Sequence, residues 1–384
     1  MNFKKIFKKY KSLGCPEGYF DPCRLPYQND KYFVICTERK SGKTTNVLLF
    51  SMCQQWVEEN RNQIIYVRQT SDMVERRNLR QLFDTIKAYG YIEKITEGHY
   101  TDLLYASHGW YYCNYGEDGK VADREADPFM LCLSVDQYET YKSTLNTNAL
   151  IIIFDEFISR RYMQDEFIFW CDIVSTCFRQ PFQNEGFIFM LANTIDREHQ
   201  YFYEMELNDA IHRLPIGAHT EIITSGGTPI YLELYTRGQT PEKSLYNRLF
   251  FGFKNKKLGA ITGKDWSLKP LPHPSKDDTR EVIARNFYIQ YEDRLIQLNL
   301  CRGEVDGMHV VAYFPNKSDI PKDATIYSLG IMLDWRHHYK FGHTPADKYV
   351  WTLYERKKFF YTSNAVGAIV DKYYQSAKDY RRLY

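Results

Sequence analysis

Gly42, Lys43 and Thr44 follow a short apolar run at residues 31–37 and have the chemistry needed to bind the phosphates of a nucleotide. Glycine permits a tight backbone turn, lysine reaches the β and γ oxygens, and a threonine hydroxyl is a ligand for Mg²⁺. Residues 44–58 are predicted to form a helix whose first N–H groups face the same phosphates. The segment predicts binding of a nucleotide with Mg²⁺, with Ser41 and Thr45 as further contacts.

The match to the phosphate-binding pattern G-x-x-x-x-G-K-[ST] is incomplete, because Thr37 stands at the position of the first glycine. Gly-Lys-Thr on its own is a weak signal, since these residue types are common. The pattern also requires a strand before the loop and a helix after it, and the sequence predicts both. This context favours a nucleotide site.

An acidic pair, Asp155 and Glu156, ends the almost wholly apolar run 148–154. Such a run is typical of a strand in a parallel sheet that is covered on both faces. At the carboxyl edge of that sheet, Asp155 is placed to hold Mg²⁺ and Glu156 to orient an attacking water. The alternative is that the two carboxylates cap the next helix. Taken with the Gly-Lys-Thr segment, the pair predicts nucleotide hydrolysis.

Alternating strand and helix patterns position these groups and continue to about residue 205. Strands are expected at 63–68, 129–135, 150–154 and 186–192, a hairpin at 100–115, and helices at 72–89 and 165–178. This order predicts a doubly wound α/β domain with a largely parallel sheet over residues 1–205.

The pattern changes after residue 206, where glycine and proline interrupt it. A small linker domain is expected over residues 206–270, with a proline-rich stretch at 269–275. Residues 286–290, 294–301 and 309–314 alternate like an antiparallel meander, and a helix is expected over 365–384. We therefore predict a separate α+β domain over residues 271–384. A chain of 384 residues is also longer than one core usually supports.

Composition narrows the class of protein. The formal net charge of +2 excludes a protein that coats nucleic acid with a uniformly basic surface, but it allows local basic faces. The nine cysteines contain no C-x-x-C pair, which indicates reduced core residues. No secretory signal or membrane-spanning run is found, so an intracellular protein without a membrane partner is expected. The amphipathic N-terminal segment 3–10 either packs on its own domain or contacts nucleic acid or a partner.

The ordered set of segments resembles a known family. The segment Arg39–Thr44, with an arginine in a loop that lacks its first glycine, looks like the phosphate loop of phage terminase large subunits. The set as a whole is more similar to the DNA-packaging ATPase, or encapsidation protein, of small short-tailed double-stranded DNA phages. It covers about residues 30–200 and consists of 39–44, 66–68, 133–135, 142–143, 153–158, 178–179 and 192–193.

The resemblance implies roles for four further residues. The nucleotide would be ATP with Mg²⁺. Arg39 would contact its phosphate, and Asn193 would couple the site to the γ-phosphate. Lys142 and Arg179 would reach the nucleotide of a neighbouring subunit, where a cation supplied in trans stabilises transition-state charge. The alternatives are that Arg179 is a cation at the end of the helix 165–178, that Lys142 is a solvated loop charge, and that Asn193 forms a turn.

The resemblance also implies a terminase-like (ASCE) ATPase in a ring of about five subunits that translocates double-stranded DNA into a procapsid. Its partners would be the portal and a structural RNA, and it would work in the host cytoplasm while docked on the procapsid. The C-terminal domain would be RNase H-like and would have lost its nuclease activity. Two-metal cleavage needs converging carboxylates, and the available acids are Glu292, Asp293, Glu304, Asp306, Asp319, Asp323, Asp334 and Asp371. A helicase-like nucleic-acid-dependent ATPase and a nucleotide-binding scaffold without turnover remain the alternatives.

Overall fold

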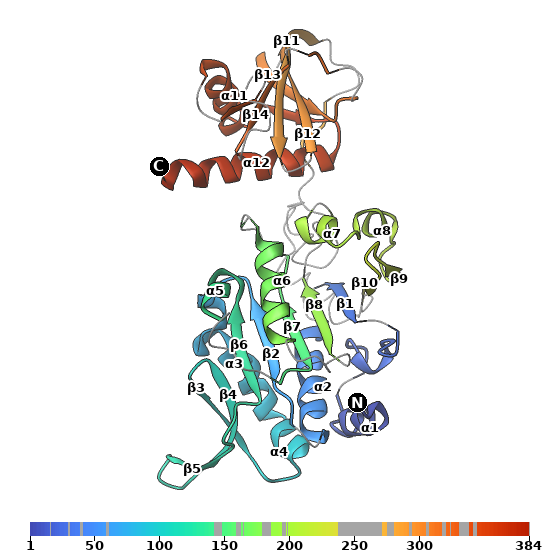
Figure 1. Cartoon of the computed structure of the whole chain (residues 1–384), viewed down its shortest axis with the longest axis vertical. Helices are drawn as coiled ribbons and strands as arrows, with labels where there is room; N and C mark the ends of the chain where they lie inside the picture. The colour runs from blue at the N-terminus through green and yellow to red at the C-terminus, as the bar shows by residue number, and fades with distance from the viewer. Residues whose placement is uncertain are drawn as a thin grey trace, which may run out of the picture. The chain divides into compact units, whose positions relative to one another are not determined.

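A computed structural model gives the fold of the chain in two compact units, Met1–Leu268 and Lys269–Tyr384, and each is described by itself (Figure 1). The structure describes residues 1–15, 17–29, 31–38, 41–58, 61–141, 148–158, 163, 165–178, 186–193, 197, 199–236, 271–274, 280–291, 294–304, 307–316, 320–322, 324–329, 338–340 and 344–383.

The first unit is built around a 10-stranded sheet in the order β3-β4-β6-β2-β7-β8-β1-β10-β9, with β5 paired to β4. Strands β6, β2, β7, β8, β1 and β10 run parallel, and the strands toward the two edges run antiparallel to their neighbours. The large, mostly parallel sheet expected from the sequence is confirmed. The strands are β1 (Tyr32–Thr37), β2 (Ile64–Arg68), β3 (Asp102–Ala106), β4 (Gly109–Tyr115), β5 (Val121–Arg124), β6 (Met130–Ser134), β7 (Ile151–Asp155), β8 (Phe187–Ala192), β9 (His219–Ile223) and β10 (Pro229–Tyr235).

Helices cover both faces of this sheet. The single helix expected at 72–89 is divided into η2 and α3, because Glu75 between them is extended. The α-helices are α1 (Phe3–Ser12), α2 (Lys43–Val57), α3 (Arg76–Ala88), α4 (Tyr91–Thr96), α5 (Tyr138–Tyr141), α6 (Glu166–Cys177), α7 (Gln200–Glu204) and α8 (Asn208–Arg213). The 3₁₀ helices are η1 (Pro22–Arg24), η2 (Ser71–Val74) and η3 (Val135–Gln137).

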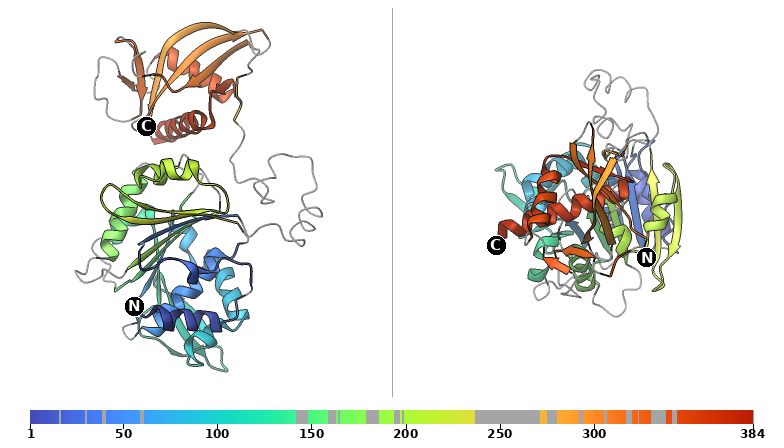
Figure 2. Two further views of the ribbon diagram at one scale, coloured as in Figure 1. Left: turned by 90° about the vertical axis from the view of Figure 1, so that its right-hand side faces the viewer. Right: turned by 90° about the horizontal axis from the view of Figure 1, so that it is seen from above.

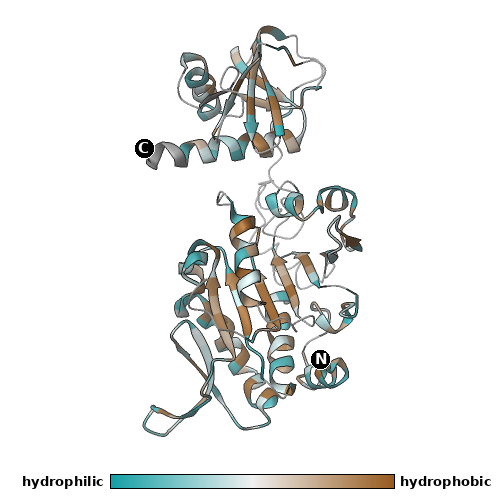
Figure 3. Cartoon of the chain, viewed as in Figure 1, coloured by the Kyte–Doolittle hydropathy of each residue, from teal (hydrophilic) through white to brown (hydrophobic). Residues whose placement is uncertain are grey.

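Two hydrophobic cores lie on opposite faces of the sheet. Phe33 and Ile35 of β1 pack in the core shared with α1 to α4, whereas Val34 and Cys36 pack in the core shared with α6 to α8. Alternate residues of a strand point to opposite faces, so a strand buried on both faces must be apolar throughout. Figure 2 shows the two helix layers on the two sides of the sheet, and Figure 3 shows the apolar central strands.

Helix α2 is buried along most of its length. Apart from its first turn, every residue from Asn46 to Gln55 is less than a tenth exposed. It packs against α1, whose buried Ile6 and Tyr10 belong to the same core. The N-terminal amphipathic segment therefore uses its apolar face for packing within its own unit, as the first of the two alternatives expects.

Part of the segment expected to form a linker domain extends the first sheet. β10 pairs in parallel with the whole of β1, from Tyr32 opposite Ile230 to Thr37 opposite Tyr235. We therefore assign residues 206–236 to the first unit. The glycines and prolines that suggested a linker are compatible with this assignment, since Gly217 and Gly227 have positive φ outside the strands. Residues 237–270 lie outside the described residues.

The second unit contains a six-stranded sheet in the order β15-β14-β11-β12-β13-β16. β11, β12 and β13 form the expected antiparallel meander, and β14, β15 and β16 are added in parallel. The elements are β11 (Arg280–Tyr291), β12 (Arg294–Gly303), β13 (Gly307–Tyr313), β14 (Thr325–Ser328), β15 (His338–Lys340), β16 (Phe359–Tyr361), α11 (Pro345–Glu355) and α12 (Asn364–Leu383). Among the described residues of both units, no helix combines the length and apolar character needed to cross a membrane.

Candidate active site

The loop between β1 and α2 requires glycine at position 42 for two reasons. Gly42 has φ of 76° and caps α2 in the left-handed conformation, which is costly for other residues. A Cβ atom at this position would also lie 2.6 Å from Cδ1 of Tyr19. The first N–H groups of an α-helix have no partner within the helix, so Lys43, Thr44 and Thr45 present theirs at the start of α2.

Thr37, which stands at the first glycine position of the phosphate-binding pattern, holds the loop through its side chain. Its hydroxyl donates to the Glu38 carbonyl over 2.9 Å and lies 2.7 Å from the Ser41 hydroxyl. Thr37 and Ser41 are almost fully buried. Ser41 therefore uses its side chain to hold the loop, and its carbonyl accepts from the Phe20 N–H over 3.0 Å.

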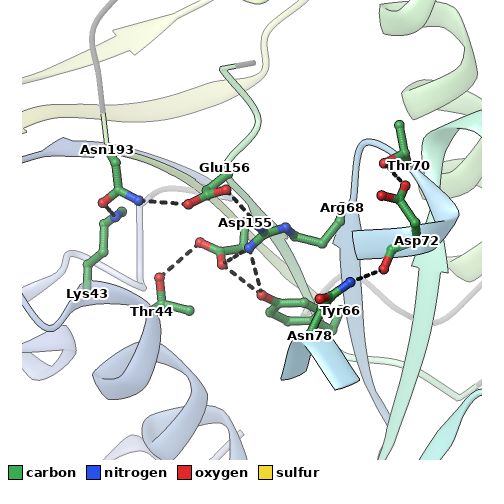
Figure 4. Close-up of polar contacts among 10 residues, drawn as sticks. All are labelled: Lys43, Thr44, Tyr66, Arg68, Thr70, Asp72, Asn78, Asp155, Glu156 and Asn193. Carbon is green, nitrogen blue, oxygen red and sulfur yellow. Dashed lines mark hydrogen bonds and ion pairs between the residues drawn. The ribbon is translucent and has the colours of Figure 1, made fainter. Parts of the chain in front are cut away.

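Lys43, Asn193 and Glu156 form a continuous polar chain at the carboxyl edge of the sheet (Figure 4). Lys43 Nζ donates to Oδ1 of Asn193, and Nδ2 of Asn193 donates to Oε1 of Glu156 over 3.0 Å. Lys43 is 3% exposed. Burial lowers the pKa of its ammonium, while Asp155 and Glu156 oppose that shift. The amide of Asn193 thus connects the lysine of the loop to the acidic pair.

Asp155 lies between the loop helix and β2. Its Oδ1 accepts from Oγ1 of Thr44 over 2.9 Å, and its Oδ2 accepts from the Tyr66 hydroxyl and from Nη1 of Arg68, each over 2.7 Å. Burial, followed by the charge of Asp155, raises the pKa of the Tyr66 hydroxyl well above its ordinary value, so Tyr66 remains a donor. The carboxylate of Asp155 is therefore held by donors from two other elements, α2 and β2.

Arg68 joins the two carboxylates. Its Nη2 donates to Oε2 of Glu156 over 2.6 Å, while Nη1 holds Asp155. Burial disfavours the charge on Arg68, but Tyr66, Asp155 and Glu156 raise its pKa above the ordinary value. The side chain of Asp155 is 5% exposed and that of Glu156 is 44% exposed. Only the second carboxylate is therefore open to solvent water.

The backbone of Glu156 is also specialised. Its φ of 55° is in the left-handed region, which costs about 1–2 kcal/mol for a residue with a Cβ. This turn directly follows β7 and directs the side chain to Asn193 and Arg68. The next described helix, α6, begins at Glu166 with Asp165 as its N-cap. The acidic pair is thus engaged with the loop rather than with that helix.

Thr44 and Asp155 fit a magnesium ion. Both offer hard oxygen atoms, and Mg²⁺ in nucleotide sites is held by one or two protein ligands, the phosphates and water. Their side-chain oxygens lie 2.9 Å apart, so the two ligands converge on one region beside the loop. The Oδ2 atom of Asp155 is already oriented by Tyr66 and Arg68, which leaves Oδ1 facing the loop.

The structure brings most of the candidate residues together, and three remain outside its described part. Ser41, Gly42, Lys43, Thr44, Thr45, Asp155, Glu156 and Asn193 all lie in or around the β1–α2 loop. Arg39, Lys142 and Arg179 are outside the described residues. No individual role was predicted for Tyr66 or Arg68. A signal existed, since an arginine ends an apolar strand, but its meaning depends on β2 lying beside β7.

A second buried carboxylate, that of Glu166, contacts the residue that follows Arg68. Glu166 is fully buried and accepts from Nε2 of Gln69 over 2.9 Å, from Nε2 of Gln200 over 3.1 Å and from the Tyr201 hydroxyl over 3.2 Å. Burial raises its pKa to about 7, although the three donors oppose the shift. Gln69 follows Arg68 directly, so this cluster ties the end of β2 to α6 and α7.

The carboxylates considered for a nuclease site are mostly outside the described residues. Only Glu304 and Asp371 are described, and Oδ1 of Asp371 accepts from the Tyr354 hydroxyl over 2.9 Å. Within the described part of the chain, no three His, Cys, Asp or Glu side chains gather to hold a metal ion.

The fold is that of viral DNA-packaging motor proteins. One solved structure, the phi28 gp11 DNA packaging motor, matches 94% of this chain and 99% of its own with a TM-score of 0.56 and 13% identity. The bacteriophage phi29 viral genome packaging motor assembly matches 95% of this chain and 99% of its own with a TM-score of 0.52 and 16% identity. The resemblance noted in the sequence is thereby confirmed at the level of the fold. No family model matches the sequence, and no curated protein matches it.

Proposed function

We propose that this chain is the ATP-hydrolysing subunit of a motor that moves double-stranded DNA into a viral procapsid. The hydrolytic part of the proposal rests on one observation: the contacts Lys43–Asn193–Glu156–Arg68–Asp155–Thr44 form an unbroken chain around the β1–α2 loop. The packaging part is supported by a fold likeness that covers nearly the whole chain.

Each member of the chain of contacts has a distinct task in hydrolysis. Lys43 and the N–H groups of the loop would bind the β and γ phosphates. Thr44 and Asp155 would hold Mg²⁺, which neutralises phosphate charge when bound. Glu156, with one side open to solvent, would orient the attacking water, and Arg68 and Asn193 would fix the direction of its carboxylate.

We further propose that the site is completed by cations that lie outside the described residues. Arg39 would contact phosphate from the loop itself, whereas Lys142 and Arg179 would reach the nucleotide of the next subunit. Such an arrangement requires a ring, for which we propose about five subunits. A cation supplied in trans stabilises charge that develops on the phosphoryl group and links hydrolysis to the neighbour.

DNA would be held through its phosphates, since a packaging motor must move any sequence. We propose that the C-terminal unit is an RNase H-like domain that grips DNA without cutting it. Its chain order supports this assignment: three antiparallel strands come first, and two strands then join in parallel beside the first of them. The portal of the procapsid and a structural RNA are the proposed docking partners in the host cytoplasm.

ATP turnover with and without double-stranded DNA tests the proposal. We expect DNA-stimulated hydrolysis in the wild type and ATP binding without hydrolysis in Glu156→Gln, because this change removes the charge and keeps the shape. Glu139→Gln, an exposed glutamate in α5, is the matched control and should turn over normally.

Other outcomes identify the alternative functions. Stimulation by single-stranded DNA alone would indicate a helicase-like ATPase, and ATP binding with no turnover under any condition would indicate a scaffold. DNA affinity should fall steeply with salt and vary little with sequence. Metal-dependent cleavage of DNA by the full chain would contradict the inactive nuclease assignment.

A further inference from the structure

The residues that would face the γ-phosphate lie on one side of the phosphate loop. Glu156 follows β7 and Asn193 follows β8, and the sheet order is β7-β8-β1-β10 (Figure 1). A nucleoside triphosphate carries its γ-phosphate at one end and its base at the other. With its phosphates in the loop after β1 and the γ-phosphate toward β8, its base must lie toward β10.

An aromatic surface occupies that other side. Tyr19 is half-buried and packs directly on Gly42, where a Cβ atom would be 2.6 Å from its ring. Tyr235, the last residue of β10, donates from its hydroxyl to the Gly18 carbonyl over 3.4 Å and packs edge-on against Phe20 with ring centroids 5.4 Å apart. Residues 18–20 and the end of β10 therefore form one surface beside the loop.

This surface is built rather than incidental, because several contacts fix it to the loop. The Phe20 N–H donates to the Ser41 carbonyl over 3.0 Å, and Nδ2 of Asn46 donates to the Phe20 carbonyl over 2.7 Å. Arg24 lies over the rings of Phe20 and Tyr235, with its guanidinium carbon 4.9 and 5.1 Å from their centroids, and pairs with the buried Glu233 over 2.5 Å.

We infer that Tyr19 is the stacking platform for the base of the bound nucleoside triphosphate, with Tyr235 supporting the segment that carries it. The inference rests on the proposed nucleotide site and adds the residue that distinguishes a nucleotide from a bare triphosphate. Stacking on an aromatic side chain contributes through the flat face that every base has. Tyr19 would act on binding of the base.

The test compares two ligands in the presence of Mg²⁺: a non-hydrolysable ATP analogue and inorganic tripolyphosphate, which lacks the base. We expect Tyr19→Ala to weaken the analogue about tenfold or more and to change tripolyphosphate binding by less than about twofold. Tyr19→Phe keeps the ring and should bind the analogue like the wild type. Tyr89→Ala, which removes a tyrosine 62% exposed at the end of α3, is the control and should affect neither ligand.

Each contrary outcome is decisive. If Tyr19→Ala weakens both ligands equally, Tyr19 supports the loop and does not bind the base. If it weakens neither, or if the wild type binds the two ligands with equal affinity, the base lies elsewhere while the phosphate site stands. If the wild type binds neither ligand, the proposed nucleotide site is itself wrong.

Discussion

Arg68 Nη2 donates to Oε2 of Glu156 across 2.6 Å, so the solvent-open carboxylate of the site is paired with a cation of its own chain. The same guanidinium holds Asp155 through its other nitrogen. The contact with Arg68, together with the one from Nδ2 of Asn193, fixes the orientation of the Glu156 carboxylate. The pair therefore favours a water-orienting role for Glu156.

Replacing Arg68 should damage hydrolysis more than nucleotide binding. Arg68→Ala frees Glu156 and leaves the buried Asp155 without its cation, and we expect kcat to fall about 10²-fold. Arg68→Lys should recover only part of this loss, because one ammonium does not reproduce the two-pronged geometry of a guanidinium. Steady-state ATPase assays measure both effects. Arg80→Ala, in an exposed pair with Asp84 on α3, is the control; normal turnover in Arg68→Ala would contradict the assignment.

Gly42→Ala should destabilise the loop through both backbone strain and steric overlap. The left-handed conformation alone costs about 1–2 kcal/mol, and the new Cβ would meet Tyr19. Gly90→Ala is a matched control, since Gly90 has φ of 65° but no atom within 4 Å of the added carbon. Urea unfolding should show a larger loss for Gly42→Ala, and only this variant should lose tripolyphosphate binding. Equal effects of the two changes would mean that the Tyr19 contact is unimportant.

Glu166 should make the stability of the protein depend on pH. Because burial raises its pKa from an ordinary value of 4.5 to about 7, the folded state binds a proton more tightly than the unfolded state. Its contribution is fully present below about pH 4.5 and is lost as the pH rises through about 7. Each pH unit between the two pKa values changes the free energy of unfolding by about 1.4 kcal/mol.

Urea unfolding of the wild type and Glu166→Gln between about pH 5 and 8 measures this dependence. We expect the stability of the wild type to decline relative to the variant as the pH rises. Parallel curves would show that Glu166 stays ionised in the folded protein and that its three donors outweigh burial.

Arg179 should act on the nucleotide of a neighbouring subunit. Rings made only of Arg179→Ala should bind ATP and hydrolyse almost none. Lys43→Ala subunits are inactive in their own sites but still carry Arg179, so mixing the two variants should restore some hydrolysis. If Arg179 only stabilises the end of α6, the variant should instead keep near-normal activity and lose about 0.3–1 kcal/mol of stability. Absence of complementation at every mixing ratio, with both variants assembled, would exclude action in trans.

The sequence predicted most of the first unit because its signals are local. The apolar runs that became β1, β2, β7 and β8, and the Gly-Lys-Thr segment at the start of α2, can be identified within a short window. The parallel pairing of β10 with β1 could not be predicted, since it joins segments separated by most of the unit and has no local pattern. The role of Arg68 was missed for the same reason: it depends on which strand lies beside β7.

The N-terminal region shows a different limit of sequence reasoning. Tyr19 and Phe20 lie in an irregular segment, where no periodicity predicts what a side chain contacts. Gly42 was predicted as a turn residue from the loop pattern alone. The second requirement, space for Tyr19, becomes visible only when the two segments are brought together.

The burial of α2 has a consequence for the proposed motor. A helix whose residues from Asn46 to Gln55 are all enclosed cannot lose its hydrogen bonds in a small fluctuation, so its amide protons should exchange with deuterium only through the largest openings of the unit. The helix that begins at the phosphate loop is thus expected to be a rigid part of the unit. In the motor proposed above, a change at the γ-phosphate would therefore be transmitted through the carboxyl-edge side chains of β2, β7 and β8 and the segments that follow them.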